Sequence, residues 1–144
     1  MNILITGHDA FHNKGCQALI YTTTKILKQT FPGTSFTIFS WEPEYDSNHF
    51  YNDNIESQFI RHRYKTGEFS HRNRFWYFLN YYLGMKTDRF IWVNSSFYES
   101  IKRSDLLVVS GGDVLGDYGD NAIKHYFFPI AVAIALRKPV YVFA

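Results

Sequence analysis

The 144-residue sequence has one cysteine, Cys16, and no uninterrupted apolar run long enough to cross a membrane. A lone cysteine excludes an internal disulfide framework and is typical of a reducing compartment. Because a membrane-spanning helix needs about 20 predominantly apolar residues, we expect no such helix. Met1 leads at once into an apolar strand, without the charged and apolar regions of a signal peptide. We therefore expect a cytoplasmic protein.

The sequence also lacks a strong charge of either sign and a metal-binding pattern. The formal net charge is +2, which is too small to indicate a nucleic-acid partner. The six histidines show no H-x-x-H or H-E-x-x-H spacing, so no zinc site is predicted. Asp113, Asp117 and Asp120 lie close together in sequence, but no second cluster of ligands accompanies them. We expect no bound metal.

What the sequence does contain is an alternation of strands and helices. Strands are predicted at residues 2–6, 35–40, 58–61, 105–109 and 139–144, and helices at 16–29, 75–83, 95–103 and 121–136. This alternation predicts a single α/β domain over residues 1–144, a Rossmann-like, doubly wound, mainly parallel sheet with helices on both faces. The continuous apolar runs at 105–109 and 140–143 are typical of central strands that are buried on both sides.

Two local features complete this prediction. The first helix places Leu19, Ile20, Ile26 and Leu27 roughly on one face, which we expect to be buried. The polar stretch that follows the second strand contains Pro43 and Asp46 and is predicted to be a loop.

Two glycine turns, each directly after an apolar strand, are the strongest functional signal. Residues 7–15 follow the strand 2–6, and residues 110–117 follow the strand 105–109. Open α/β sheets bind ligands at the carboxyl ends of their strands, where the strand order reverses. Right-handed crossovers place the first strand beside the fourth. We therefore expect the two turns to lie side by side and to form one wall of a ligand pocket.

The first turn offers backbone flexibility, followed by a helix N-terminus that attracts anions. Its spacing is neither the dinucleotide fingerprint nor a P-loop. The residues of this turn that we expect to bind a ligand are Gly7, His8, Asn13, Gly15 and Gln17. The alternative, which the sequence leaves open, is a strand–helix connection with a glycine-assisted cap.

The second turn adds carboxylates to adjacent glycines. Ser110, Gly111 and Gly112 are expected to bring backbone amides close to a ligand oxygen. Asp113 is the predicted catalytic residue, which contacts or activates a sugar hydroxyl as a general base, and Asp117 is a predicted ligand contact. Helix capping is the alternative role for such aspartates.

A basic segment, residues 61–74, precedes an aromatic one, residues 75–83. A solvated face next to a core helix is one interpretation. An interfacial surface for anionic lipid headgroups is the second, and nucleic-acid binding is the third.

The motifs together resemble those of the polysaccharide pyruvyl transferases. The resemblance rests on the opening strand, on Gly7 and Asn13-x-Gly15-x-x-Ala18-Leu19, and on Ser-Asp-Leu-Leu-Val-Val-Ser-Gly-Gly-Asp at residues 104–113. It covers nearly the whole chain as the N-terminal half of the family. Cys16 stands where many members carry an acidic residue, and Asp113 where many carry a third glycine.

The resemblance implies one lobe of a two-lobed arrangement similar to that of GT-B glycosyltransferases. It also implies transfer of a pyruvyl group from phosphoenolpyruvate, the donor substrate, to a saccharide or lipid-linked saccharide, with no separate cofactor. The ketal product belongs to cell-surface polysaccharides, so contact with the inner face of the membrane is expected. The second lobe of the family supplies the groups that hold phosphoenolpyruvate, so residues 1–144 alone are not expected to be active.

The sequence leaves open the extent of the protein and two alternative functions. The chain ends on an apolar strand, and we expect it to be the N-terminal lobe of a larger protein; the alternative is a domain that ends on its last strand. A GT-B glycosyltransferase lobe shares the same layout. A non-catalytic carbohydrate-binding domain is the third possibility.

Overall fold

A computed structural model describes residues 1–8, 10–51, 55–61, 95–111 and 129–143. Three of the predicted site residues, Gly112, Asp113 and Asp117, lie outside these ranges. The predicted helix 75–83 lies outside them too, as does all of the basic segment after Arg61.

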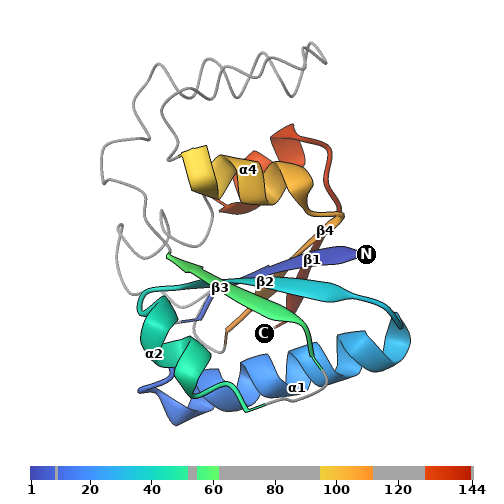
Figure 1. Cartoon of the computed structure of the whole chain (residues 1–144). Helices are drawn as coiled ribbons and strands as arrows, with labels where there is room; N and C mark the ends of the chain where they lie inside the picture. Colours follow the sequence, from blue (N-terminus) through green and yellow to red (C-terminus); the bar gives the residue numbers. More distant parts are fainter. Residues whose placement is uncertain (9, 52–54, 62–94, 112–128, 144) are drawn as a thin grey trace.

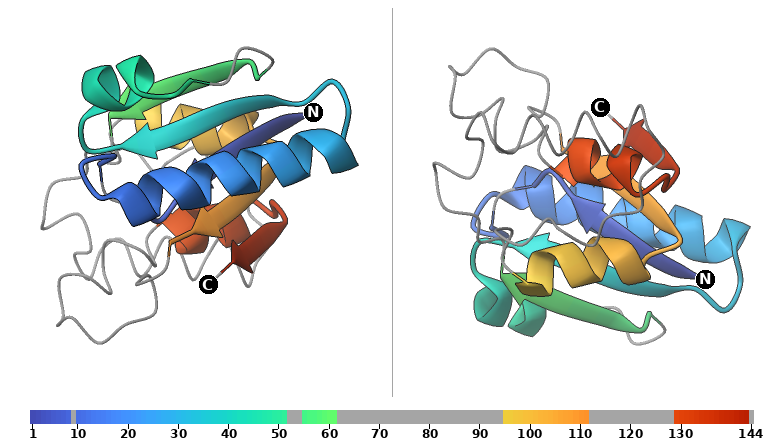
Figure 2. Two further views of the ribbon diagram at one scale, coloured as in Figure 1. Left: turned by 90° about the horizontal axis from the view of Figure 1, so that it is seen from below. Right: turned by 90° about the horizontal axis from the view of Figure 1, so that it is seen from above.

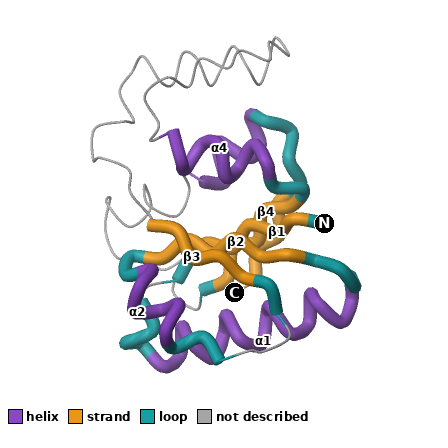
Figure 3. Tube along the Cα trace, in the orientation of Figure 1, coloured by secondary structure: helices purple, strands orange, loops and turns teal. Residues whose placement is uncertain are grey.

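The described elements follow the predicted alternation closely (Figures 1 and 3). The strands are β1 (Asn2–Thr6), β2 (Ser35–Ser40), β3 (Ser57–Arg61), β4 (Leu106–Ser110) and β5 (Val140–Phe143), and the helices are α1 (Lys14–Thr30), α2 (Pro43–Asn48) and α4 (Ser95–Arg103). Residues 129–135 are also helical. The predicted parallel α/β architecture is confirmed.

The described strands form one all-parallel sheet with the order β3-β2-β1-β4-β5. β1 pairs with β2 in the register Ile3↔Phe36 and with β4 in the register Ile3↔Leu106. The strand order therefore reverses at β1, where the chain passes from one half of the sheet to the other. In sheets of this kind the carboxyl ends on either side of the reversal line the ligand site.

Each face of the sheet packs against its own helices, because alternate residues of a strand point to opposite faces. Figure 2 shows α1 along one face, and α4 with residues 129–135 along the other. On the α1 side, Ile3, Ile5 and Val108 pack with Ile20 of α1. The core on the α4 side contains Leu4, Phe39, Leu107, Val109, Tyr98, Ile101, Val132 and Ala133. Burial on both faces explains why β1 and β4 are nearly continuous apolar runs.

Asn13 is the N-cap of α1. Its side-chain oxygen accepts hydrogen bonds from the N–H groups of Gly15 (2.9 Å) and Cys16 (3.4 Å). These groups belong to the first turn of the helix and have no partner within it. The helix therefore starts at Lys14, before the predicted Cys16. On its apolar face Ile20 and Leu27 are buried as predicted, whereas Ile26 is 51% exposed.

Two predictions about local structure are wrong. The stretch that contains Pro43 and Asp46 is the short helix α2, because proline fits the first helical position and the buried carboxylate of Asp46 anchors the turn. The strand β5 is not buried on both sides. It is an edge strand of the described sheet, and Tyr141 is 60% exposed. An apolar composition did not distinguish an edge strand from a central one.

Candidate functional site

The two predicted turns follow neighbouring strands at the same edge of the sheet. Thr6 of β1 is in register with Val109 of β4, so Gly7 and Ser110 come next on adjacent parallel strands. Gly7 has a φ of 98°, a conformation that any residue with a Cβ atom disfavours. Glycine is therefore required where the chain turns away from β1. The predicted adjacency is confirmed up to Gly111, where the described part of the second turn ends.

His8 and Asp46 form a buried pair at this edge. His8 follows β1 and Asp46 lies on α2, and both side chains are completely buried. The Nε2 of His8 lies 3.6 Å from Oδ2 of Asp46, which is longer than a hydrogen bond but within the range of electrostatic attraction between a carboxylate and a ring N–H. Neither ring nitrogen of His8 has a hydrogen-bond partner among the described residues.

The carboxylate of Asp46 also holds two neighbouring segments. Its Oδ1 accepts a hydrogen bond of 2.8 Å from the backbone N–H of Phe11, and its Oδ2 accepts one of 2.6 Å from the Ser40 hydroxyl. Burial raises the pKa of Asp46, but the His8 ring, the Ser40 hydroxyl and the Phe11 N–H lower the pKa by more, so that it lies below its ordinary value. Asp46 is thus an ionised carboxylate inside the protein at neutral pH.

A second histidine–carboxylate pair lies on the surface next to the buried one. The Nε2 of His12 lies 3.0 Å from an Oε2 of Glu42, and both side chains are more than half exposed. The ring of Tyr45 is stacked between His12, at a centroid distance of 3.9 Å, and His49, at 4.0 Å. The segment between β1 and α1 therefore contacts α2 and its N-cap twice, through Phe11 and Asp46 in the interior and through His12 and Glu42 at the surface.

The predicted residues on α1 are engaged within the protein. Asn13 uses its side-chain oxygen to cap the helix, and Gly15 is one of the two residues that it caps. A Cβ at Gly15 would lie 3.1 Å from the capping oxygen, so the glycine also makes room for the cap. Gln17 donates to the carbonyl of His49 (2.9 Å) and accepts from Lys14 (3.1 Å). Helix capping, the alternative left open by the sequence, is present; a ligand role for these residues stays a prediction.

Ser110 lies at the end of β4 with its hydroxyl turned toward α1. The Oγ of Ser110 and the Oγ1 of Thr23 are 2.8 Å apart, and both groups are buried. This hydrogen bond joins the end of β4 to the middle of α1. Gly111 follows and is buried as well. The Ser110 side chain thus has a structural partner, and its expected ligand contact stays a prediction.

Sequence reasoning missed Asp46 and Ser40. Both lie close to a buried histidine in space, but Asp46 is separated from His8 by α1 and β2 in sequence. Its surroundings of proline, serine and asparagine are typical of a solvated loop. The only signal was a serine at the end of β2 followed by an aspartate six residues later, a pattern too common to indicate a contact.

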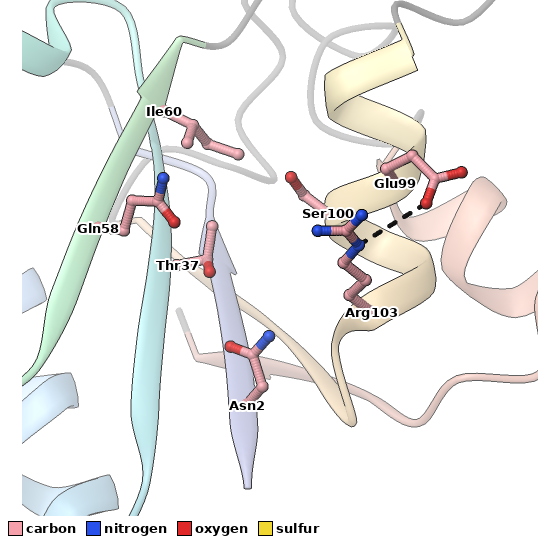
Figure 4. Close-up of a pocket in the computed structure, with 7 residues that line it drawn as sticks. All are labelled: Asn2, Thr37, Gln58, Ile60, Glu99, Ser100 and Arg103. Carbon is pink, nitrogen blue, oxygen red and sulfur yellow. Dashed lines mark ion pairs between the residues drawn. The ribbon is translucent and has the colours of Figure 1, made fainter.

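A separate hollow of about 490 Å³ lies between α4 and the face of the sheet (Figure 4). Its lining residues are Asn2, Thr37, Gln58, Ile60, Glu99, Ser100 and Arg103. Arg103 pairs with Glu99 at 3.8 Å on the exposed side of α4. This hollow lies on the face of the sheet that α4 covers, whereas Gly7 and Ser110 lie at the carboxyl edge.

The described part of the chain bears on the metal and membrane predictions. No group of three histidine, cysteine or acidic side chains in it could hold a metal ion. Within the same residues, no helix combines the length and apolar character needed to cross a bilayer.

The all-parallel sheet, its strand order and the helices on both faces define a Rossmann-like α/β domain. The family model of the polysaccharide pyruvyl transferases matches residues 13–144. The chain therefore belongs to the polysaccharide pyruvyl transferase family. Searches among curated proteins and among solved structures gave no match. β1, Gly7 and His8 precede the matched residues, so the family match does not cover them.

Proposed function

We propose that this chain is the acceptor-side lobe of an enzyme that transfers a pyruvyl group from phosphoenolpyruvate to two hydroxyls of a saccharide, and that the lobe belongs to a GT-B-like pair. The observation that carries the proposal is the family match over residues 13–144. The placement of Gly7 beside the end of β4 supports it, because this is where open parallel sheets bind ligands.

The chemistry requires two hydroxyls and one leaving group. One acceptor oxygen bonds to C2 of phosphoenolpyruvate, its proton passes to a base, and C3 receives a proton to become a methyl group. The bond between C2 and the phosphate oxygen then breaks, and the electron pair leaves with the phosphate. The second hydroxyl oxygen bonds to C2 and loses its proton, which completes the ketal. No cofactor beyond the donor substrate is needed.

We assign the acceptor hydroxyl to the carboxyl edge of β1 and β4. In this proposal Asp113 contacts or activates the hydroxyl, while His8, Asn13 and the backbone of Gly7 and Gly111 shape the pocket. Gly15, Gln17, Ser110, Gly112 and Asp117 complete the proposed set. Asp113, Gly112 and Asp117 lie outside the described residues, so their part rests on the resemblance of the motif.

The decisive experiment measures phosphoenolpyruvate consumption, phosphate release and ketal formation with saccharide acceptors, using the protein as its gene encodes it. Asp113→Asn should reduce turnover strongly, because an amide cannot take up a proton. Glu44→Gln, an exposed change on α2, is the matched control and should leave turnover unchanged. Equal turnover of the two variants would remove the role of Asp113.

Other outcomes would replace the proposal. Release of a nucleotide from a nucleotide-sugar would indicate a glycosyltransferase, and saccharide binding without turnover of either donor would indicate a binding domain.

We also propose that the acceptor is lipid-linked and reached from the cytoplasmic side of the membrane. The support is the basic and aromatic sequence of residues 61–83. Co-sedimentation with vesicles should then increase with their content of anionic lipid, and co-sedimentation that is independent of that content would exclude the idea.

A further inference from the structure

His8 is a buried polar side chain for which the described residues provide no hydrogen bond. It is 4% exposed as a residue, and its Nδ1 and Nε2 both lack a partner among the residues that the structure describes. Buried polar groups in proteins are nearly always hydrogen-bonded, and an exception calls for an explanation. His8 directly follows Gly7 at the edge of the sheet where ligands bind.

Asp46 determines which nitrogen of His8 carries a proton. An ionised carboxylate can only accept hydrogen bonds, and the Ser40 hydroxyl already donates to the same Oδ2 that faces the ring. A lone pair on Nε2 at 3.6 Å from this oxygen would be repelled, whereas an N–H is attracted. Nε2 therefore carries the proton in both charge states of the imidazole. In the neutral ring Nδ1 is left as the acceptor.

Phe11 packs beside the His8 ring. Its side chain is fully buried and lies 5.7 Å from the His8 ring between centroids. Its backbone N–H is bound to the same Asp46 carboxylate, and its ring packs edge-on against Phe59 of β3. One carboxylate thus holds the histidine electrostatically and the neighbouring aromatic residue through its backbone.

We propose that Asp46 is a positioning residue that holds His8 in the Nε2–H tautomer, so that Nδ1 accepts a hydrogen bond from a ligand hydroxyl. The inference rests on the proposed function in one respect, which is that the hydroxyl belongs to the saccharide acceptor. Solvent does not reach the ring in this structure. The Nε2 proton should therefore exchange slowly in the free protein. A ligand hydroxyl that binds Nδ1 must displace the groups that cover the ring, which should change the ring resonances.

The first test is the nitrogen-15 spectrum of the histidine rings in the 144-residue chain at neutral pH. We expect His8 to show the pattern of a single Nε2–H tautomer, with a ring proton that survives solvent exchange. In Asp46→Asn the single-tautomer pattern should be lost, because an amide can donate as well as accept. Ser40→Ala keeps the carboxylate and should keep the pattern. An Nδ1–H tautomer in the unmodified chain would overturn the inference, whatever the stability of the variants.

The second test adds ligands one at a time. A methyl hexopyranoside should shift the Nδ1 resonance of His8 and leave that of His12 in place, while phosphoenolpyruvate alone should shift neither. A shift with phosphoenolpyruvate only, or with neither compound, would overturn the ligand part. If the tautomer is confirmed and the saccharide shifts Nδ1, while the protein as its gene encodes it transfers no pyruvyl group, the proposed function fails and the role of Asp46 stands.

Discussion

The backbone N–H of Phe11 donates a hydrogen bond of 2.8 Å to the buried carboxylate of Asp46, which connects the segment after β1 to α2. These two residues are far apart in sequence and belong to different crossovers of the sheet. The contact explains why the short, polar helix α2 has a fixed place.

Asp46→Ala should destabilise the fold by roughly 3 kcal/mol, because each buried group left without a partner costs about 1–3 kcal/mol. The groups concerned are the Phe11 N–H and the Ser40 hydroxyl. The free energy of unfolding in urea measures the effect. Glu44→Ala on the same helix is the control and should cost less than about 1 kcal/mol, since that side chain is exposed. Equal losses of unfolding free energy in the two variants would show that Asp46 does not anchor the segment between β1 and α1.

The same carboxylate predicts a dependence of stability on pH. The pKa of Asp46 is lowered in the folded chain, so the folded state binds a proton less readily than the unfolded one. The stabilisation is fully present above the unfolded pKa, about 4, and is lost as the pH falls through the folded pKa. Urea titrations from neutral pH down to pH 2.5 should show a falling free energy of unfolding below about pH 4. Asp46→Asn should remove this contribution. A difference between the two proteins that does not change with pH would contradict the prediction.

Asn13 allows capping to be separated from ligand binding. Asn13→Ala should cost about 1 kcal/mol, because the first turn of α1 loses its acceptor. Asn13→Asp keeps an acceptor oxygen and adds a favourable charge at the helix N-terminus, so its thermal midpoint should equal or exceed the original. If the Asn13 amide also donates to the acceptor saccharide, Asn13→Asp should weaken saccharide binding while the fold is kept. Unchanged binding would leave Asn13 with the capping role alone.

Thr23 and Ser110 are suited to a double-mutant cycle. Each hydroxyl is buried against the other at 2.8 Å, so Thr23→Val or Ser110→Ala leaves one polar group unpaired. We expect each single variant to lose about 1–2 kcal/mol and the double variant to lose less than the sum. Urea unfolding of the four proteins gives the coupling energy. A coupling near zero would mean that the two hydroxyls stabilise the fold independently.

The strands of the sheet could be predicted from the sequence because they are more apolar than the segments that flank them. β1 and β2 have the predicted bounds, and the reversal at β1 follows from the handedness of crossovers. The pairing of Thr6 with Val109 then places both turns at one edge. These features depend on local pattern and on a general rule of topology, and both can be read from one chain.

The contacts of individual side chains could not be predicted in the same way. Asp46 was assigned to a loop because its neighbours are polar, and nothing in the sequence relates it to His8 or Phe11. The edge position of Tyr141 was missed for a similar reason, since an apolar strand has the same composition wherever it lies in the sheet. Both errors concern long-range packing, which the periodicity of a segment does not encode.

The pairing of β1 with β4 has a consequence for the time course of folding. The backbone N–H of Asn2 binds the side chain of Asp105, 103 residues further along. On the ribosome, β1 therefore waits until β4, about a hundred residues further along, has emerged before its second neighbour exists. Such distant pairing raises the contact order, and chains of this type complete their sheets more slowly than helical bundles of equal size. Until β4 arrives, the half-sheet of β3, β2 and β1 has an unpaired apolar border along β1.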